Sequence, residues 1–329
     1  MKQTLKYWMV ALLLATTAWS GYAQTKNEMD LSGEWAFQTD VMDFRRGSLD
    51  VRYCHRLQES IVLPGITDDY KIGYKSPYRH LDRLTRVYEY MGPAWYQREI
   101  EIPADWKGKR IFLYFERTHW LSSVYVGKDE VSKIDYISVP HNHELTQWLH
   151  PGKKELITFC IDNRYQYDTH KWDHAHSEFT QINWNGVLGE IKLVAVDPVY
   201  MDDVQVYPDV KNKSIKVKMA IRNCTKNAVK SNLTFRIKGE KYELQKEVPF
   251  NTNDSIAYIE EEIALGKDIR LWNEFQPNIY TLECKLTTPT AKQSYIHEKS
   301  TTFGMREVGE SEDHILINGQ PIHLRGTVE

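Results

Sequence analysis

One polar stretch, residues 162–185, carries most of the side chains in this sequence that could bind a ligand. It holds two tryptophans, three asparagines and three histidines. An aromatic ring can stack on the apolar face of a sugar, and amide and imidazole groups can hydrogen-bond its hydroxyls. We therefore expect Asn183, Trp184 and Asn185 to bind a carbohydrate substrate. The alternative is a solvated loop whose tryptophans pack back onto the protein.

The same stretch contains a group of histidines and aspartates that could be taken for a metal cluster. The group consists of Asp168, His170, Asp173, His174 and His176. Its spacing matches no zinc pattern and no cysteine joins it, so we expect neither a metal nor another cofactor. No serine lies in a nucleophile elbow, and no glycine-rich loop suits a phosphate. The sequence therefore presents no catalytic residue.

The overall charge excludes some partners. The chain has 329 residues and a formal net charge of only −3. This balance gives no electrostatic reason to expect nucleic acid or an anionic membrane as partner. The length is sufficient for two ordinary domains with their own cores.

The first 23 residues predict an export signal. Lys2 and Lys6 precede an apolar run at residues 7–19, and the small residues Gly21 and Ala23 suit a cleavage site. The run is too short to span a membrane. We expect the mature protein to begin near Gln24 and to be periplasmic or secreted, with no membrane contact after cleavage; an N-terminal anchor is the alternative.

Four cysteines would remain after cleavage: Cys54, Cys160, Cys224 and Cys284. An oxidising compartment permits disulfides, but a core of this size does not require them. Cys160 lies in an apolar run and is expected to pack as a small hydrophobic residue. Whether Cys224 and Cys284 form a disulfide stays open.

Short segments of alternating polarity predict an all-β chain. Residues 110–116, 155–161, 215–221 and 279–286 are examples, and Pro, Gly and Asp turns separate such segments. The composition changes near residues 197–198: most tryptophans precede this point and only Trp272 follows it. Two β-sandwiches in succession account for both features. After them, residues 314–326 read as strand, Asn-Gly turn and strand, which is a hairpin pattern.

Short motifs recur in a fixed order along the chain. They lie at residues 31–35 (LSGEW), 94–98 (AWYQR), 186–193 (GVLGEIKL), 277–282 (PNIYTL), 303–308 (FGMREV) and 317–326 (INGQPIHLRG). In this order they resemble glycoside hydrolase family 2, which contains β-galactosidases, β-glucuronidases and β-mannosidases. Gly189 departs from the family pattern, because arginine is frequent at that position.

The resemblance implies three domains after the signal at residues 1–23. A jelly-roll, galactose-binding-like β-sandwich would occupy residues 24–196, and an immunoglobulin-like β-sandwich would occupy residues 197–303. Residues 304–329 would be the first hairpin of a truncated (β/α)8 barrel. The missing barrel is the expected intramolecular partner.

The resemblance also implies where the chemistry occurs. Retaining glycosidases use two carboxyl groups about 5–5.5 Å apart, and in a (β/α)8 barrel the active site lies at the C-terminal ends of the strands. In the family both groups are glutamates from later barrel strands, which residues 1–329 do not include. Arg325 matches the family arginine beside the nucleophile, where a guanidinium could hold a carboxylate. The alternative for Arg325 in this chain is an exposed tail.

These expectations combine into one functional hypothesis. The chain is the N-terminal, non-catalytic part of a retaining exo-β-glycosidase that acts on a terminal β-linked sugar, with β-galactosidase as the first choice of specificity and β-glucuronidase as the second. Without the carboxylate pair we expect the 329-residue chain itself to be inactive. The alternatives are a stand-alone carbohydrate-binding or truncated non-enzymatic protein, and a scaffold within a larger complex.

Overall fold

A computed structural model of the chain describes residues 27–43, 57–79, 81, 86–137, 139–167 and 183–327. The expected export signal, Cys54 and the histidines considered as metal ligands lie outside these residues. The chain divides into two compact units, Met1–Ala195 and Val196–Glu329, each described here by itself. The boundaries expected for the domains remain predictions.

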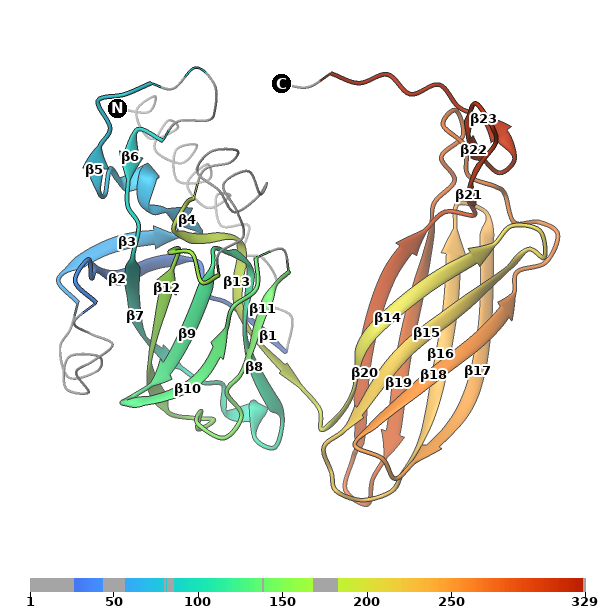
Figure 1. Cartoon of the computed structure of the whole chain (residues 1–329). Helices are drawn as coiled ribbons and strands as arrows, with labels where there is room; N and C mark the ends of the chain where they lie inside the picture. Colours follow the sequence, from blue (N-terminus) through green and yellow to red (C-terminus); the bar gives the residue numbers. More distant parts are fainter. Residues whose placement is uncertain are drawn as a thin grey trace, which may run out of the picture. The chain divides into compact units, whose positions relative to one another are not determined.

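Unit 1 is built from two antiparallel sheets (Figure 1). The first has the order β1 (Glu28–Asp30), β13 (Gly186–Val196), β8 (Arg110–Thr118) and β11 (His141–Glu144), with β4 (Gly65–Ile66) also paired to β13. The second has the order β10 (Asp129–Ile134), β9 (Leu121–Val126), β12 (Lys154–Asp162), β7 (Pro93–Glu101), β2 (Gly33–Thr39) and β3 (Glu59–Leu63). The strands β5 (Tyr74–Lys75) and β6 (Tyr88–Glu89) form a separate pair, and the 3-10 helices are η1 (Thr67–Tyr70) and η2 (Ala104–Trp106).

The core of unit 1 lies between these two sheets, around the ring of Phe159. Phe159 on β12 stacks on Tyr96 of β7 at 4.7 Å between ring centroids, and Trp35 of β2 meets it edge-on at 5.0 Å. Phe115 of the opposite sheet lies 4.8 Å away. All four rings are fully buried. Unit 1 is therefore a β-sandwich whose two sheets are joined by aromatic packing.

The other face of β12 is also covered. Cys160 points away from the main core and packs with Leu57, Trp95 and Tyr125 in a second buried cluster. The expectation that Cys160 packs as a small hydrophobic residue agrees with this position. Because both faces are covered, every residue from 157 to 162 is buried, including the polar Thr158 and Asp162.

The structure explains why residue 189 is glycine in this chain, although the family pattern often has arginine there. Its φ of +73° is a left-handed conformation that side chains with a Cβ rarely adopt. A Cβ built at Gly189 would also lie 2.1 Å from Glu116 Oε2. That same oxygen accepts the backbone N–H of Glu190 at 2.9 Å. In this chain the Glu116 carboxylate occupies the space that a side chain at residue 189 would need.

Unit 2 is an elongated sandwich of long strands (Figure 1). One sheet has the order β14 (Val199–Asp209), β15 (Ser214–Asn223) and β18 (Ile256–Ala264). The other has the order β17 (Tyr242–Thr252), β16 (Val229–Gly239), β19 (Tyr280–Pro289) and β20 (Ser294–Phe303). A small third sheet contains β21 (Val308–Glu310), β22 (Ile315–Ile317) and β23 (Gln320–Pro321).

The core of unit 2 follows directly from the alternation of its strands. On β15 and β19 every second side chain is buried, and the intervening ones are mostly polar. Val217 and Ile221 of one sheet share a core with Phe235 and Leu282 of the other. Cys284 is buried in this core, Cys224 is partly buried, and both are free thiols. The disulfide that the sequence left open is absent from this structure.

The predicted terminal hairpin forms and is fastened to the end of unit 2. Asn318 and Gly319 have φ values of +52° and +77°, which is the two-residue turn that Asn-Gly favours. The Asn318 amide donates to the carbonyls of Trp272 at 2.9 Å and Met305 at 3.2 Å, and its oxygen accepts the N–H of Glu307 at 2.8 Å. The second strand of the hairpin is shorter than predicted, because β23 ends at Pro321. Its role as the start of a barrel remains a prediction.

The prediction of an all-β chain of sandwiches is confirmed. Residues 110–116, 155–161, 215–221 and 279–286 all lie in strands, apart from Ile279 at the start of the last segment. Across the described ranges, no helix has both the length and the apolar character needed to cross a membrane.

Candidate functional site

The polar stretch singled out in the sequence begins where β12 ends and finishes where β13 begins. Its two ends are joined by a reciprocal pair of hydrogen bonds. The Asn163 amide donates to the Asn183 carbonyl at 2.9 Å, and the Asn183 amide donates to the Asn163 carbonyl at 2.7 Å. Both residues are buried. The pair therefore closes the intervening segment at its base.

Asn163 extends this closure to a third segment of the chain. Its side-chain oxygen accepts the N–H of Gly92 at 2.9 Å, and its amide also donates to the Tyr90 carbonyl at 2.9 Å. One asparagine thus satisfies backbone groups from two segments far apart in the sequence. Removing it would leave several buried polar groups without a partner, which is costly.

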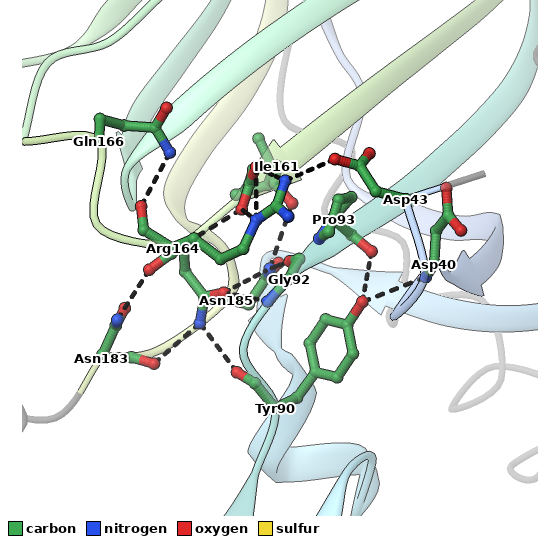
Figure 2. Close-up of polar contacts among 12 residues, drawn as sticks. Asp40, Asp43, Tyr90, Gly92, Pro93, Ile161, Arg164, Gln166, Asn183 and Asn185 are labelled. Atoms are coloured by element: carbon green, nitrogen blue, oxygen red, sulfur yellow. Dashed lines mark hydrogen bonds and ion pairs between the residues drawn. The ribbon is translucent and has the colours of Figure 1, made fainter. Parts of the chain in front are cut away.

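Asn185 lies fully buried beneath this pair, next to Gly92 (Figure 2). Its amide donates to the carbonyls of Gly92 at 2.9 Å and Ile161 at 3.2 Å. The Tyr96 hydroxyl donates to its side-chain oxygen at 3.4 Å. The amides of Asn183 and Asn185 are thus directed at the protein backbone in this structure. Their predicted role in substrate binding stays a prediction, and what the structure shows is that they join the segment before β13 to Asn163, Gly92 and Ile161.

An ion cluster forms around Arg164, the residue after Asn163, and Figure 2 shows Arg164 paired with Asp43. Arg164 donates from Nη2 to Asp162 at 2.7 Å and to Asp43 at 2.8 Å, and from Nε to Asp162 at 3.0 Å. The hydrogen bonds to Asp162 are the main reason why the pKa of Arg164 is raised above its usual value. Asp162 is fully buried, so its charge is compensated within the protein by this guanidinium.

Tyr90 fixes the segment that Asn163 contacts. Its hydroxyl donates to the Pro93 carbonyl and accepts the N–H of Asp40 at 3.1 Å. Burial raises the pKa of Tyr90 well above its ordinary value, so the phenol stays protonated and remains a donor. The base of the loop is therefore rigid on all sides for which the structure gives contacts.

Trp184, the third predicted binding residue, is half-buried at one end of a row of rings. The ring of His119 lies 5.7 Å from it, and Trp120 lies 6.0 Å from His119. Trp120 in turn meets Tyr165 edge-on at 6.3 Å and Tyr167 at 6.2 Å. We call Trp184, His119, Trp120, Tyr165 and Tyr167 the aromatic row. It is buried in the middle and exposed at the two tyrosines.

A chain of buried hydrogen bonds supports the neighbouring strand β11. His141 Nε2 donates to the Tyr136 carbonyl at 2.9 Å, so Nδ1 of the neutral ring must accept from the Ser122 hydroxyl at 2.6 Å. Ser122 then accepts from His143 Nε2 at 2.8 Å, and His143 Nδ1 accepts from Ser132 at 2.8 Å. Burial, with a smaller effect from His141, lowers the pKa of His143 to about 3. Ser122 is fully buried as well, so this serine–histidine contact is structural.

Arg325 lies in the irregular segment that follows β23 and is exposed. Arg325 belongs to unit 2, whereas Asn183, Trp184 and Asn185 belong to unit 1. Within the described ranges, no three His, Cys, Asp or Glu residues gather in a way that could hold a metal ion. Arg325 as a substrate-binding residue remains a prediction.

The geometry limits what chemistry this region can do. Asp43 and Asp162 approach each other, but both bind the same Arg164 side chain, and Asp162 has no exposed surface. A retaining glycosidase needs one carboxylate that attacks a sugar and one that protonates its leaving group, both facing a cleft. This pair cannot serve that purpose. The exposed aromatic rings beside it suit binding instead.

Known proteins with similar sequences carry the same family name. Residues 199–306 match the profile of glycosyl hydrolases family 2. Beta-glucuronidase from Pongo abelii is 23% identical over 327 residues, which cover 92% of this chain and 48% of that protein. The chain spans about half the length of the curated relatives it matches.

Solved structures agree on the fold. A glycosyl hydrolase family 2 member from Bacteroides cellulosilyticus has a TM-score of 0.71 at 19% identity, covering 91% of this chain and 38% of that one. A Ruminococcus gnavus β-glucuronidase in complex with D-glucuronic acid has a TM-score of 0.66 at 18% identity, covering 92% and 50%. These structures share the fold of two successive β-sandwiches with this chain. The chain is similar to glycosyl hydrolases family 2 in its family profile and in its relatives, and the similarity fits the N-terminal portion of that family.

Sequence reasoning missed several residues that shape this region. His119 and Trp120 lie between β8 and β9, and Asp135 and Tyr136 lie in the segment after β10. The Tyr-x-Tyr pattern at residues 165–167, directly after a strand, was the available signal for the exposed end of the row. Only strand pairing shows that these segments meet.

Proposed function

We propose that this chain is the N-terminal, non-catalytic part of a retaining exo-β-glycosidase that removes a terminal β-linked sugar. The observation that carries the proposal is the match of more than nine-tenths of the chain to β-glucuronidases, together with the two successive sandwiches. The catalytic step would belong to a (β/α)8 barrel that follows residue 329 and packs with the chain as its intramolecular partner.

The sugar specificity is a separate part of the proposal. The relatives named above are β-glucuronidases, which favours a β-glucuronide as substrate of the whole protein. A β-galactoside, the first choice from the sequence, is the rival. Nitrophenyl β-D-glucuronide and nitrophenyl β-D-galactoside, offered to the protein together with its downstream region, distinguish the two. Hydrolysis of neither by the longer protein would contradict the glycosidase proposal.

The 329-residue chain alone is proposed to be inactive. The Asp43–Arg164–Asp162 cluster supports this for its own two carboxylates, because both bind one guanidinium. Purified chain should release no nitrophenol above the uncatalysed rate. Sustained turnover by pure chain would overturn the assignment of catalysis to downstream sequence.

A stand-alone carbohydrate-binding role is the second candidate, and the exposed tyrosines of the aromatic row favour it. The DNA downstream of residue 329 discriminates the two. A barrel with two suitable glutamates encoded there supports the enzyme, and its absence supports the binding protein.

Export is proposed from the segment at residues 1–23. Expression in a bacterial host followed by N-terminal sequencing of the periplasmic or secreted protein tests it. The expected first residue is Gln24.

A further inference from the structure

The exposed end of the aromatic row lies at one end of a sheet. Leu121, the first residue of β9, pairs with Asp162 at the end of β12, and Ser122 pairs with Ile134 at the end of β10. The segments that continue from these three strands therefore emerge side by side. They carry Trp120, the two tyrosines of residues 165–167, and Asp135.

The two tyrosines are exposed around a buried tryptophan. Tyr165 is 44% exposed and Tyr167 is 60% exposed, whereas Trp120 between them is only 2% exposed. The Trp120 ring supports both, at 6.3 Å and 6.2 Å between centroids. Two large rings are thus presented to solvent on a firm base. Such a platform suits a flat, partly apolar ligand.

A carboxylate lies at the edge of this platform. The Tyr167 hydroxyl donates to Asp135 Oδ2 at 2.5 Å, and this hydrogen bond raises the pKa of Tyr167. The bond fixes the orientation of the ring and of the carboxylate together. Because both are already ordered, a ligand that stacks there loses less side-chain entropy than it would on two free side chains. A carboxylate oxygen can also accept further hydrogen bonds from hydroxyl donors.

The segment that carries Asp135 is itself anchored from below. His141 donates to the carbonyl of Tyr136, the next residue, and is held by Ser122 and through it by His143. Both histidines are fully buried. The backbone beside Asp135 is therefore held by buried hydrogen bonds.

We propose that Tyr165, Tyr167 and Asp135 form a binding site for a neutral pyranose, which stacks on the tyrosine rings and donates its hydroxyls to the carboxylate. The choice of a sugar as occupant rests on the proposed glycosidase function. The preference for a neutral sugar rests on Asp135, since a second carboxylate, as in a uronic acid, would be repelled there. Nothing in the comparisons assigns these residues a role.

The test is a titration of the full 329-residue chain followed by protein NMR or calorimetry. Methyl β-D-galactopyranoside and methyl β-D-glucopyranoside are the neutral probes, and methyl β-D-glucuronide is the charged one. We expect saturable binding of at least one neutral probe with a Kd on the order of 1 mM, and weaker binding of the glucuronide.

Three substitutions locate the site. Tyr167→Ala removes a stacking ring and should weaken binding about tenfold. Tyr167→Phe keeps the ring but loses the bond to Asp135, and about threefold weaker binding is expected. Asp135→Asn should reduce the preference for neutral over charged sugar. Tyr258→Ala is the matched control, because Tyr258 is an 82% exposed tyrosine of unit 2, and it should bind as the unaltered chain does.

Three results would overturn the proposal: no saturable binding of either neutral probe, unchanged affinity in both Tyr167 variants, or tighter binding of the glucuronide. Tyr167→Phe guards against a folding defect in the alanine variant, since it changes only an exposed hydroxyl. The binding assay uses the chain alone, whereas the glycosidase proposal is tested by hydrolysis with the longer protein. Either can therefore fail without the other.

Discussion

The two units bury different kinds of side chain. Unit 2 has apolar side chains between its sheets and paired charges outside, such as Lys285 with Glu298 at 2.8 Å. The polar side chains buried in its described part are one amide and four hydroxyls. Unit 1 also has an apolar core, but it buries amides, imidazoles and a carboxylate beside it. Buried polar groups need specific partners and so fix a specific geometry. The difference indicates that the geometry of unit 1 depends more on specific buried polar contacts than the geometry of unit 2 does.

The largest effects are expected from the two apolar cores, where the units should behave alike. Phe159→Ala in unit 1 and Phe235→Ala in unit 2 should each lower the free energy of unfolding of their own unit by about 3–5 kcal/mol. Both phenylalanines are fully buried, each in its own core cluster. Hydrogen exchange resolved by segment measures the loss. A loss spread equally over both units would show that they do not fold separately.

A buried amide of unit 1 should contribute more to the free energy of unfolding than an exposed amide of unit 2 does. Asn163→Ala removes a side chain that bonds Gly92, Tyr90 and Asn183, and should destabilise unit 1 by about 2–3 kcal/mol. Asn232→Ala is the control in unit 2, because that amide makes an exposed bond to Glu247 at 3.2 Å and its loss should cost about 0.5 kcal/mol or less. Urea denaturation gives both values. Equal losses of stability in the two variants would mean that the buried amide contributes no more than the exposed one.

Acid should destabilise unit 1 through its buried imidazoles. The direction of this pH dependence follows from the pKa of His143. Its folded value of about 3 lies below the ordinary 6.5, so the unfolded chain binds the proton more tightly. The stabilisation is complete above pH 6.5 and is lost as the pH falls toward 3, at about 1.4 kcal/mol per pH unit. Burial also lowers the pKa of His141. Unfolding measured between pH 7 and 4 gives the slope.

His143→Gln, which cannot take up a proton, should flatten the pH dependence of unit 1. His150→Gln is the surface control, because His150 is exposed and pairs with Glu155, and it should leave the slope nearly unchanged. His297 provides a comparison in unit 2, where burial lowers its pKa to about 4 and Nδ1 accepts the N–H of Met201 at 3.2 Å. An unaltered slope in His143→Gln would mean that folding does not lower the pKa of His143.

The terminal hairpin should show a smaller and local effect. Asn318→Ala removes the amide bonds to Trp272 and Met305 and places alanine at a positive φ, which together should cost about 1–2 kcal/mol. Faster hydrogen exchange confined to β21, β22 and β23 is expected. Asn318→Gly, which tolerates the turn, separates the conformational part from the hydrogen bonds.

The smallest effect is expected on the outer face of unit 2. Lys285→Ala breaks an exposed ion pair with Glu298 and should change stability by about 0.5 kcal/mol or less, and by less still at high salt. Thermal unfolding at low and high ionic strength measures it. A loss of more than about 2 kcal/mol would mean that exposed ion pairs contribute substantially to the stability of unit 2, contrary to this expectation.

The sequence by itself determined the features that act over a few residues. The alternation at residues 215–221 predicts a half-buried strand, and Asn318-Gly319 predicts the turn, because side-chain direction and positive φ are local properties. The order of motifs was sufficient to predict the family. A strand such as β11, with the sequence HNHE, gave no such signal, because polar side chains rarely predict burial.

Only the tertiary structure decided which polar residues meet. Asn183 and Asn185 look like ligand donors in the sequence, yet their amides turn inward to carbonyls of Asn163 and Gly92. The aromatic row joins rings that precede β9 to rings that follow β12. Asp135, which follows β10, bonds to one of them. Contacts between residues so far apart follow from strand register, which pairing along the whole sheet sets and no short window of sequence contains.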